Sequence, residues 1–142
     1  MLIAEYGIFG CHTFQIALKS AHGRYVVTES NGHVNADSVK IGPWAIFIVE
    51  ELQEDKIALK SHNGKYLVAE SNGEVKANRN RPGPWESFKV LKQADDTFAF
   101  RTWKDGYLVA ESDGRLRTDH TSFTSINPWE KFEVECFRGN IQ

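Results

Sequence analysis

Three glutamates at a fixed spacing are the first residues that suggest catalysis or metal binding. Glu29, Glu70 and Glu111 are 41 residues apart. Carboxylates that share one pocket with different environments can act as acid and base, and a cluster of them can hold a cation. Each of these glutamates, however, comes just before an Asn-Gly or Asp-Gly pair in its own part of the chain. We therefore interpret them as turn residues rather than as one shared site.

Tryptophans suggest a second kind of chemistry, the stacking of a ligand on an indole ring. Three follow prolines in Gly-Pro-Trp or Asn-Pro-Trp, namely Trp44, Trp85 and Trp129. An exposed indole can contact a sugar face or anchor a protein partner, whereas a covered one only packs beneath its loop. Trp103 takes the turn position that Ala21 and His62 hold elsewhere. We predict that Trp103 is exposed on one face, which makes it a candidate ligand contact.

Charge is distributed unevenly along the chain. Residues 53–92 contain 8 Lys/Arg and 5 Asp/Glu, a net of +3, whereas residues 1–52 have a net of −2 and residues 93–142 a net of −3. Such a segment predicts a basic surface that steers an acidic partner, although a solvated face has the same composition. Its predicted members are Lys65, Lys76, Arg79 and Arg81. The loops that differ between repeats add Asn78, Asp119 and His120 as candidate ligand contacts.

Other functional classes are disfavoured. The sequence lacks G-x-S-x-G, P-loop, H-E-x-x-H and G-x-G-x-x-G motifs, and its five histidines lack metal-ligand spacing, so we expect no enzyme and no cofactor. A net charge of −2 and a pI of 6.2 argue against general nucleic-acid binding. Without a long apolar run or a convincing signal peptide, we expect no membrane insertion and a cytoplasmic location.

These residues are positioned by an internal repeat. Tyr25, Tyr66 and Tyr107 are 41 residues apart, and the third copy has three extra residues before Asn127. The copies span about 10–52, 53–92 and 93–138 and leave no linker, so we predict one domain over residues 1–142. We expect the tyrosines to fill the interior with their hydroxyls bonded, and Phe47, Phe88 and Phe132 to join the core.

Each copy is predicted to form four short strands. Alternating apolar residues indicate half-buried strands, and Asn31-Gly32, Asn72-Gly73 and Asp113-Gly114 predict type I′ hairpin turns. Three copies give twelve strands, too few for a closed propeller. The sequence therefore predicts an all-β chain with a β-trefoil fold, a six-stranded barrel capped by three hairpins in three pseudo-symmetric repeats.

Two cysteines, Cys11 and Cys136, lie near the ends of the chain. Closure of a trefoil pairs the last strand with the first, which would bring the two cysteines close enough for a disulfide. Because we expect a reducing, cytosolic environment, we predict free thiols.

The second copy carries a family resemblance. It reads Ile-Ala-Leu-Lys-Ser-His-Asn-Gly-Lys-Tyr-Leu-Val-Ala-Glu-Ser-Asn-Gly from Ile57 to Gly73, and Lys-Ala-Asn-Arg and Gly-Pro-Trp-Glu-Ser-Phe follow. This pattern resembles the fascin-like, actin-crosslinking β-trefoil family over about the whole chain. Fascins carry four trefoils in one chain, whereas this sequence looks like a single unit. Hisactophilin-like proteins imply that a lone trefoil can bind actin, and similar modules on bacterial glycosidases imply carbohydrate binding.

Two non-catalytic functions therefore remain open. The first is actin-filament binding or crosslinking through the basic second copy, by a monomer or a weak homodimer; this binding should weaken with salt. The second is a lectin with up to three sugar sites, in which the tryptophans stack and polar loop residues bind hydroxyls.

Overall fold

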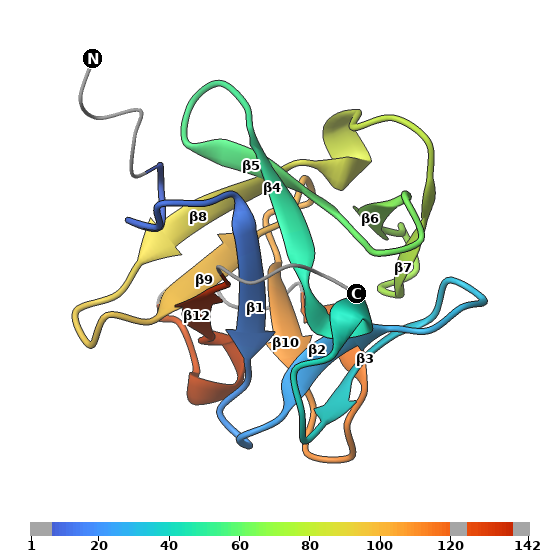
Figure 1. The fold of residues 1–142 in the computed structure, drawn as a ribbon. Helices are drawn as coiled ribbons and strands as arrows, with labels where there is room; N and C mark the ends of the chain where they lie inside the picture. Colours follow the sequence, from blue (N-terminus) through green and yellow to red (C-terminus); the bar gives the residue numbers. More distant parts are fainter. Residues whose placement is uncertain (1–6, 120–124, 138–142) are drawn as a thin grey trace.

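The computed structural model describes residues 7–119 and 125–137 and shows an all-β chain (Figure 1). Each repeat contributes four strands, as predicted. The first repeat forms β1 (Gln15–Lys19), β2 (Tyr25–Thr28), β3 (Val34–Ser38) and β4 (Phe47–Glu51). The second forms β5 (Lys56–Lys60), β6 (Tyr66–Ala69), β7 (Val75–Arg79) and β8 (Phe88–Lys92). The third forms β9 (Phe98–Arg101), β10 (Tyr107–Ala110), β11 (Leu116–Asp119) and β12 (Glu133–Cys136).

Six strands pair antiparallel in a ring. β1 pairs with β4, β4 with β5, β5 with β8, and β8 with β9. Phe98 at the start of β9 forms a bridge with Phe132, and each residue's N–H donates to the other's carbonyl at 2.9 Å. Phe132 directly precedes β12, which pairs with β1. The ring therefore joins all three repeats through backbone hydrogen bonds.

The other six strands form three hairpins, β2–β3, β6–β7 and β10–β11. Their turns differ from the predicted type I′ form. In the first turn the Gly32 N–H donates to the Glu29 carbonyl and the Glu29 N–H to the His33 carbonyl, and only Gly32, with φ 93°, lies in the left-handed region. This is a three-residue loop that ends in a glycine bulge, and it recurs at Gly73 and Gly114. Asparagine and aspartate remain in ordinary conformations, so the glycine alone carries the positive φ.

The three hairpins also bind one another. The carbonyls of Gly32, Gly73 and Gly114 accept hydrogen bonds of 2.8–2.9 Å from Ala77, Thr118 and Ala36, respectively, on the neighbouring hairpins. A Cβ at Gly114 would lie 2.9 Å from the Cβ of Asp37, so no larger residue fits there. We call this assembly of three hairpins the cap.

The core fills the inside of the ring. Phe47, Phe88 and Phe132 are at most 1% exposed, as predicted. The tyrosine prediction is only half right. Tyr66 is buried and its hydroxyl donates to Glu50 at 2.6 Å, but Tyr66 is not in the core cluster, which holds its neighbour Leu67 instead. Successive side chains of a strand point to opposite faces, and the tyrosines take the outer one.

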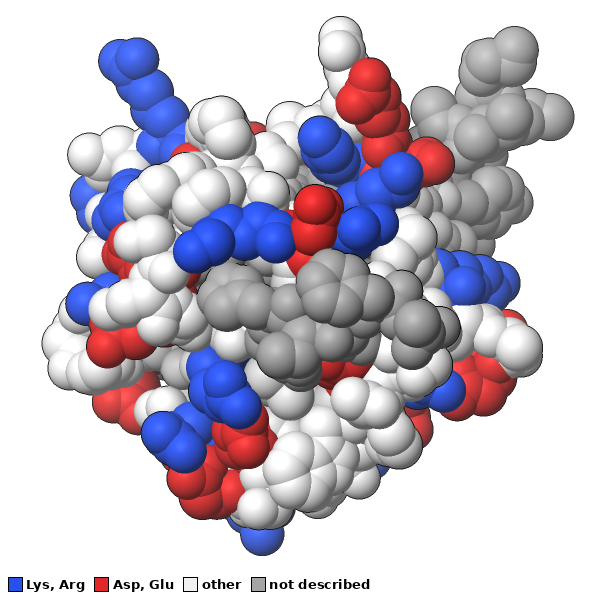
Figure 2. All heavy atoms as spheres, turned by 180° about the vertical axis from the view of Figure 1, so that it is seen from behind, with Lys and Arg blue, Asp and Glu red and all other residues white. Residues whose placement is uncertain are grey.

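Charges of both signs are interspersed on the surface (Figure 2). Several ion pairs join residues that are close in sequence, for example Lys92 with Asp96 at 3.8 Å and Arg101 with Asp105 at 3.4 Å. The face of the molecule drawn in Figure 2 shows no extended area of one charge sign among the coloured residues.

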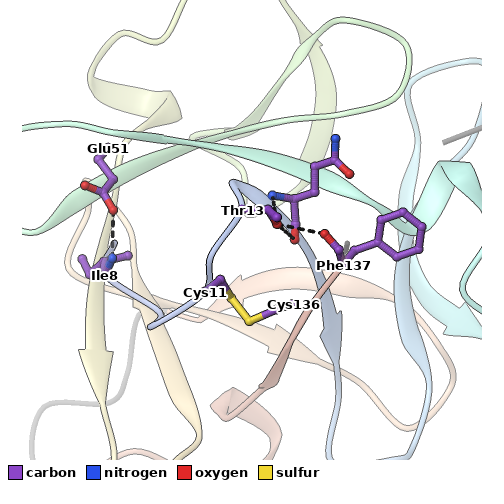
Figure 3. Close-up of a disulfide and its surroundings, with 7 residues drawn as sticks. Ile8, Cys11, Thr13, Glu51, Cys136 and Phe137 are labelled. Atoms are coloured by element: carbon purple, nitrogen blue, oxygen red, sulfur yellow. Dashed lines mark hydrogen bonds between the residues drawn. A yellow bond between two sulfur atoms is a disulfide. The ribbon is translucent and has the colours of Figure 1, made fainter. Parts of the chain in front are cut away.

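A disulfide joins Cys11 to Cys136, so the prediction of free thiols is wrong (Figure 3). The Cα atoms are 5.5 Å apart, within the usual range for a disulfide. Thr13 lies beside it and its hydroxyl donates to the Phe137 carbonyl at 2.8 Å. The prediction relied on the expected compartment, whereas the pairing of β1 with β12 decides which cysteines meet.

Candidate functional site

Each Pro-Trp segment forms a short 3₁₀ turn before the last strand of its repeat. These turns are η2 (Pro43–Ala45), η3 (Pro84–Glu86) and η4 (Pro128–Glu130). In η4 the Glu130 carboxylate accepts a hydrogen bond from the Asn127 N–H at 2.8 Å, and Glu86 caps η3 in the same way at 2.6 Å. Both glutamates are buried, which fixes the turn beneath its tryptophan. Ala45 holds this position in η2 and has no carboxylate to contribute.

Each tryptophan of these turns packs against the first turn of another repeat. The ring of Trp44 meets His62 edge-on, with centroids 4.8 Å apart, and Trp129 meets His22 at the same distance. Trp85 stacks on Trp103 with centroids 4.5 Å apart and planes only 5° from parallel. These contacts stabilise the junctions between repeats, and Trp44 and Trp85 are half-buried.

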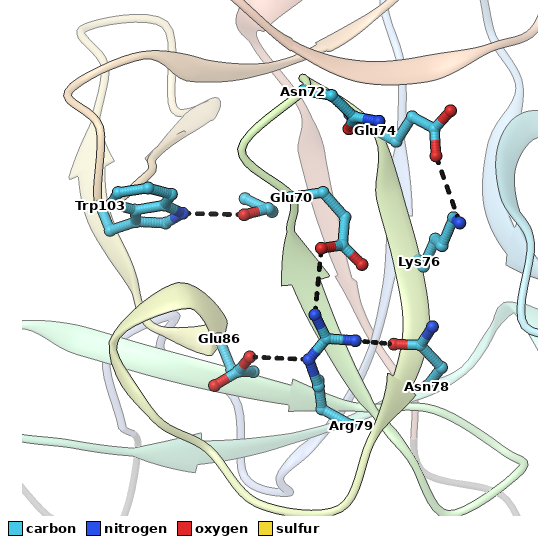
Figure 4. Close-up of polar contacts among 9 residues, drawn as sticks. Glu70, Asn72, Glu74, Lys76, Asn78, Arg79, Glu86 and Trp103 are labelled. Atoms are coloured by element: carbon cyan, nitrogen blue, oxygen red, sulfur yellow. Dashed lines mark hydrogen bonds and ion pairs between the residues drawn. The ribbon is translucent and has the colours of Figure 1, made fainter.

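Trp103 is only partly exposed, and a contact with a ligand stays a prediction. Its Nε1–H donates to the Ala69 carbonyl at 2.8 Å, and its ring is partly buried against the core (Figure 4). With one face covered by Trp85 and its only donor in use, Trp103 is built into the packing between repeats. Sequence position identified the turn correctly, but the partner ring lies 18 residues away and is brought there by the fold.

Trp129 differs from the other tryptophans because 40% of it is exposed. It borders a cavity of about 380 Å³, which we call the Trp129 cavity. The cavity's polar lining includes Glu111, Arg117 and Asn127, and Val109 and Pro128 add apolar surface. Arg117 Nε donates to Glu111 at 2.5 Å, which holds both side chains in place. The cavity thus combines an exposed indole with fixed donors and acceptors.

Two of the four residues of the predicted basic surface, Lys76 and Arg79, are paired with carboxylates of their own repeat. Arg79 contacts Glu70 at 3.0 Å and Glu86 at 3.7 Å, and it donates to Asn78 at 2.6 Å (Figure 4). Lys76 pairs with Glu74 at 3.3 Å. The three carboxylates belong to residues 53–92, whose net of +3 already includes them, so the pairing holds these two cations in place without changing the net charge of the segment.

The remaining residues of the predicted surface have different environments. Lys65 donates to Asn80, and Arg81 is exposed. Asp119 ends β11, where its backbone is paired with Tyr107. His120 lies outside the described residues.

The repeated glutamates act in the turns, as expected. Their backbone groups close the three hairpin loops. Their side chains bind the same hairpin, with Glu29 accepting from Asn35 at 2.8 Å, Glu70 from Arg79 at 3.0 Å and Glu111 from Arg117 at 2.5 Å. Among the described residues, no group of three or more His, Cys, Asp or Glu has the arrangement of a metal site.

The sequence alone does not identify two residues of the polar lining of the Trp129 cavity, Arg117 and Asn127. Neither residue is distinguished by composition or by a motif. Asn127 replaces Gly42 and Gly83 in the otherwise repeated Gly-Pro-Trp pattern. That substitution, beside the three extra residues, was the available signal that the third repeat differs.

The architecture defines an all-β protein made of three four-stranded repeats. A family model for the FRG1-like domain matches residues 41–128, which is more than half of the chain. The chain therefore belongs to the FRG1-like domain family, a β-trefoil-type family related to fascin. A search of curated proteins finds no significant match. Across residues 7–119 and 125–137, no helix is long and apolar enough to cross a membrane.

Proposed function

We propose that this chain is a single β-trefoil module that binds carbohydrate without catalysing a reaction. The trefoil assignment is supported by the six-stranded ring and by the reciprocal hydrogen bonds of the cap. The Trp129 cavity is the observation that carries the choice of ligand.

The Trp129 cavity has the composition that a sugar requires. The apolar C–H face of a sugar ring packs on an indole, while its hydroxyls need both donors and acceptors. Arg117 and Asn127 supply donors, and Glu111 supplies an acceptor. Because Arg117 and Glu111 are already paired, their positions are set before the ligand arrives, which lowers the entropy cost of binding.

Glu111 and Glu130 both line this cavity, so a glycosidase pair must be considered. Glu130, however, caps η4 in the same way as Glu86 caps η3. The position of Glu130 is therefore explained by the turn. Glu111 has its counterpart in Glu70, which also binds an arginine of its own hairpin. Both carboxylates thus repeat a structural role of the second copy, which supports binding without hydrolysis.

The test is a glycan array followed by calorimetric titration of the best ligand. Trp129→Ala should weaken binding at least tenfold, and Trp129→Phe should restore part of it. Trp44→Ala serves as the matched control, because it removes an equivalent tryptophan outside the cavity, and it should change affinity less than about twofold. Equal affinity of Trp129→Ala and wild type would overturn the site, and release of reducing ends would overturn the non-catalytic assignment.

Actin-filament binding is the second candidate, and the relationship of the FRG1-like family to fascin favours it. It requires a cytoplasmic location, and the disulfide weighs against that because such bonds are rare in the cytosol. Co-sedimentation with filaments across a salt series tests this candidate. Lys65→Glu with Arg81→Glu should abolish salt-sensitive pelleting, while Lys92→Glu on β8 should not. Low-speed pelleting would further indicate crosslinking through two sites or a homodimer.

A further inference from the structure

A second cavity, of about 400 Å³, lies where the three hairpins of the cap meet. We call it the cap cavity. Its volume falls within the range of about 300–1,000 Å³ typical of ligand pockets. Its walls come from all three repeats, with Asn35 on β3, Lys76 on β7 and Arg117 on β11 at equivalent positions. Arg117 also lines the Trp129 cavity, so one side chain borders both.

A buried polar residue breaks the threefold pattern of the lining. Thr118 stands where the other repeats have Ala36 and Ala77, and it is 3% exposed. Its hydroxyl has no hydrogen-bond partner within the described part of the chain, although it lies beside Gly73 at the cavity wall. Leaving a buried hydroxyl unpaired costs about 1–3 kcal/mol. A ligand that reaches this hydroxyl would remove that cost.

The charged residues of the cap cavity are cations with one carboxylate. Lys76, Arg115 and Arg117 line it together with Glu74, and Lys76 pairs with Glu74 at 3.3 Å, so an oxyanion on Lys76 would compete with or share this contact. Arg115 contacts Asp113 through Nε at 2.8 Å, and Arg117 contacts Glu111 through Nε at 2.5 Å. Both carboxylates lie outside the lining. Neither ion pair uses the edge of the guanidinium group formed by Nη1 and Nη2, which can bind an oxyanion in bidentate fashion, although Arg117 Nη1 also donates to the Thr118 carbonyl at 3.4 Å.

These features together favour a ligand with one anionic group and several hydroxyls. The Asn35 amide donates to Glu29 at 2.8 Å and the Asn72 amide oxygen accepts from the Glu74 N–H at 3.0 Å, so each amide keeps further hydrogen-bonding capacity that, like the hydroxyl of Thr118, an inorganic anion alone would leave unused. A neutral sugar would leave the cations without a new partner. A sugar that bears a carboxylate or a sulfate satisfies both sets of groups.

We propose that the cap cavity binds an acidic sugar unit, with its oxyanion on Lys76, Arg115 and Arg117 and a hydroxyl on Thr118. This proposal rests on the proposed carbohydrate-binding function and adds a separate site to it. The ligand class is a saccharide that carries a uronic-acid carboxylate or a sulfate group.

The decisive variant is Thr118→Ala, which installs the residue of the other two repeats. It should weaken binding of an acidic saccharide about three- to tenfold and leave the melting temperature unchanged or higher, because it removes an unpaired buried hydroxyl. Arg115→Gln should weaken it about tenfold and flatten its salt dependence. Lys92→Gln is the matched control, since Lys92 is another exposed cation paired with a nearby aspartate and lines neither cavity.

The probes for titration are digalacturonate, a heparin disaccharide, neutral lactose and inorganic sulfate. We expect both acidic disaccharides to bind more tightly than lactose and to shift the backbone amide resonances of Gly73 and Thr118. If no sugar binds, the proposed function and this inference fail together. If neutral sugars bind at Trp129 but neither Thr118→Ala nor Arg115→Gln affects acidic ones, only this inference fails. Equal binding of inorganic sulfate would also overturn it, because the site would then recognise an anion without a sugar.

Discussion

The second and third repeats place the same residue types in different surroundings. In the second, Trp85 stacks on Trp103 and is half-buried. In the third, Trp129 meets His22 edge-on and stays 40% exposed. A repeated residue can thus be a packing residue in one repeat and be available to a ligand in another. The type of neighbouring ring does not decide this by itself, because Trp44 also meets a histidine and is half-buried.

The junctions that flank these repeats differ as well. Residues 52–55 connect β4 to β5 and residues 93–97 connect β8 to β9, so the second repeat is tied to both neighbours by the chain. The third repeat meets the first where the chain ends. There Cys136 occupies the position of Glu51 and Lys92, and its disulfide to Cys11 replaces the missing connection.

Removal of the disulfide should change the stability of the junction between the third and first repeats more than any other substitution considered. We expect Cys11→Ser with Cys136→Ser to lower the free energy of unfolding by about 2–5 kcal/mol, because the bond closes a long loop. Chemical denaturation measures the loss, and wild type in reducing agent should match the variant. An unchanged midpoint would mean that strand pairing alone holds the β1–β12 junction.

Substitution of the tryptophans should cause the next largest losses of stability. Trp85→Ala removes a stacked, half-buried ring and should cost about 2–3 kcal/mol, whereas Trp129→Ala should cost less than about 1 kcal/mol. Thermal and urea unfolding of the two variants compare them directly. For ligand affinity the order should reverse, with Trp129→Ala the more damaging change. Equal stability losses would contradict the assignment of different roles.

The tyrosines of the second and third repeats should differ by a smaller loss of stability. Tyr66 donates to Glu50, but the position equivalent to Glu50 beside Tyr107 is Leu91, which offers no side-chain acceptor. Tyr66→Phe should therefore cost about 1 kcal/mol and Tyr107→Phe less, as measured by urea unfolding. A larger loss for Tyr107→Phe would show that its hydroxyl has a stronger partner than Tyr66 has.

The smallest expected effect is a loss of stability at alkaline pH. The hydrogen bond to Glu50, followed by burial, raises the pKa of Tyr66 above its ordinary value of 10.0, and burial, followed by the bond to Glu135, raises the pKa of Tyr25. Unfolded tyrosines ionise near pH 10 while these stay protonated, so their contribution to stability is complete below pH 10. It is lost as pH rises through the raised values.

Tyrosinate absorbance against pH, with denaturation midpoints at each pH, checks this expectation. Glu50→Gln should lower the pKa of Tyr66 toward 10. Simultaneous ionisation of all four tyrosines near pH 10 would refute it.

Much of the fold could be read from the sequence, because a spacing of 41 residues repeats strands, turns and core positions together. Ile16, Ile57 and Phe98 show this, since each follows from its place in the pattern and each is buried. The candidate site was less accessible. Arg117 gains its importance from Glu111 on the same hairpin and from Trp129 in η4, and no local pattern links the three.

The sequence by itself determined the all-β class, the twelve strands, the repeat boundaries and the buried phenylalanines, since these depend on local alternation and spacing. Only the tertiary structure decided that Cys11 meets Cys136, that Arg79 pairs with Glu70 and Glu86, and that Trp103 stacks on Trp85 while Trp129 stays 40% exposed. The physical reason is that burial and charge pairing depend on neighbours that local alternation and spacing do not specify, whether they belong to the same repeat or to another one. A symmetric sequence pattern specifies equivalent backbones, but the side chains that differ between repeats decide what each equivalent position does.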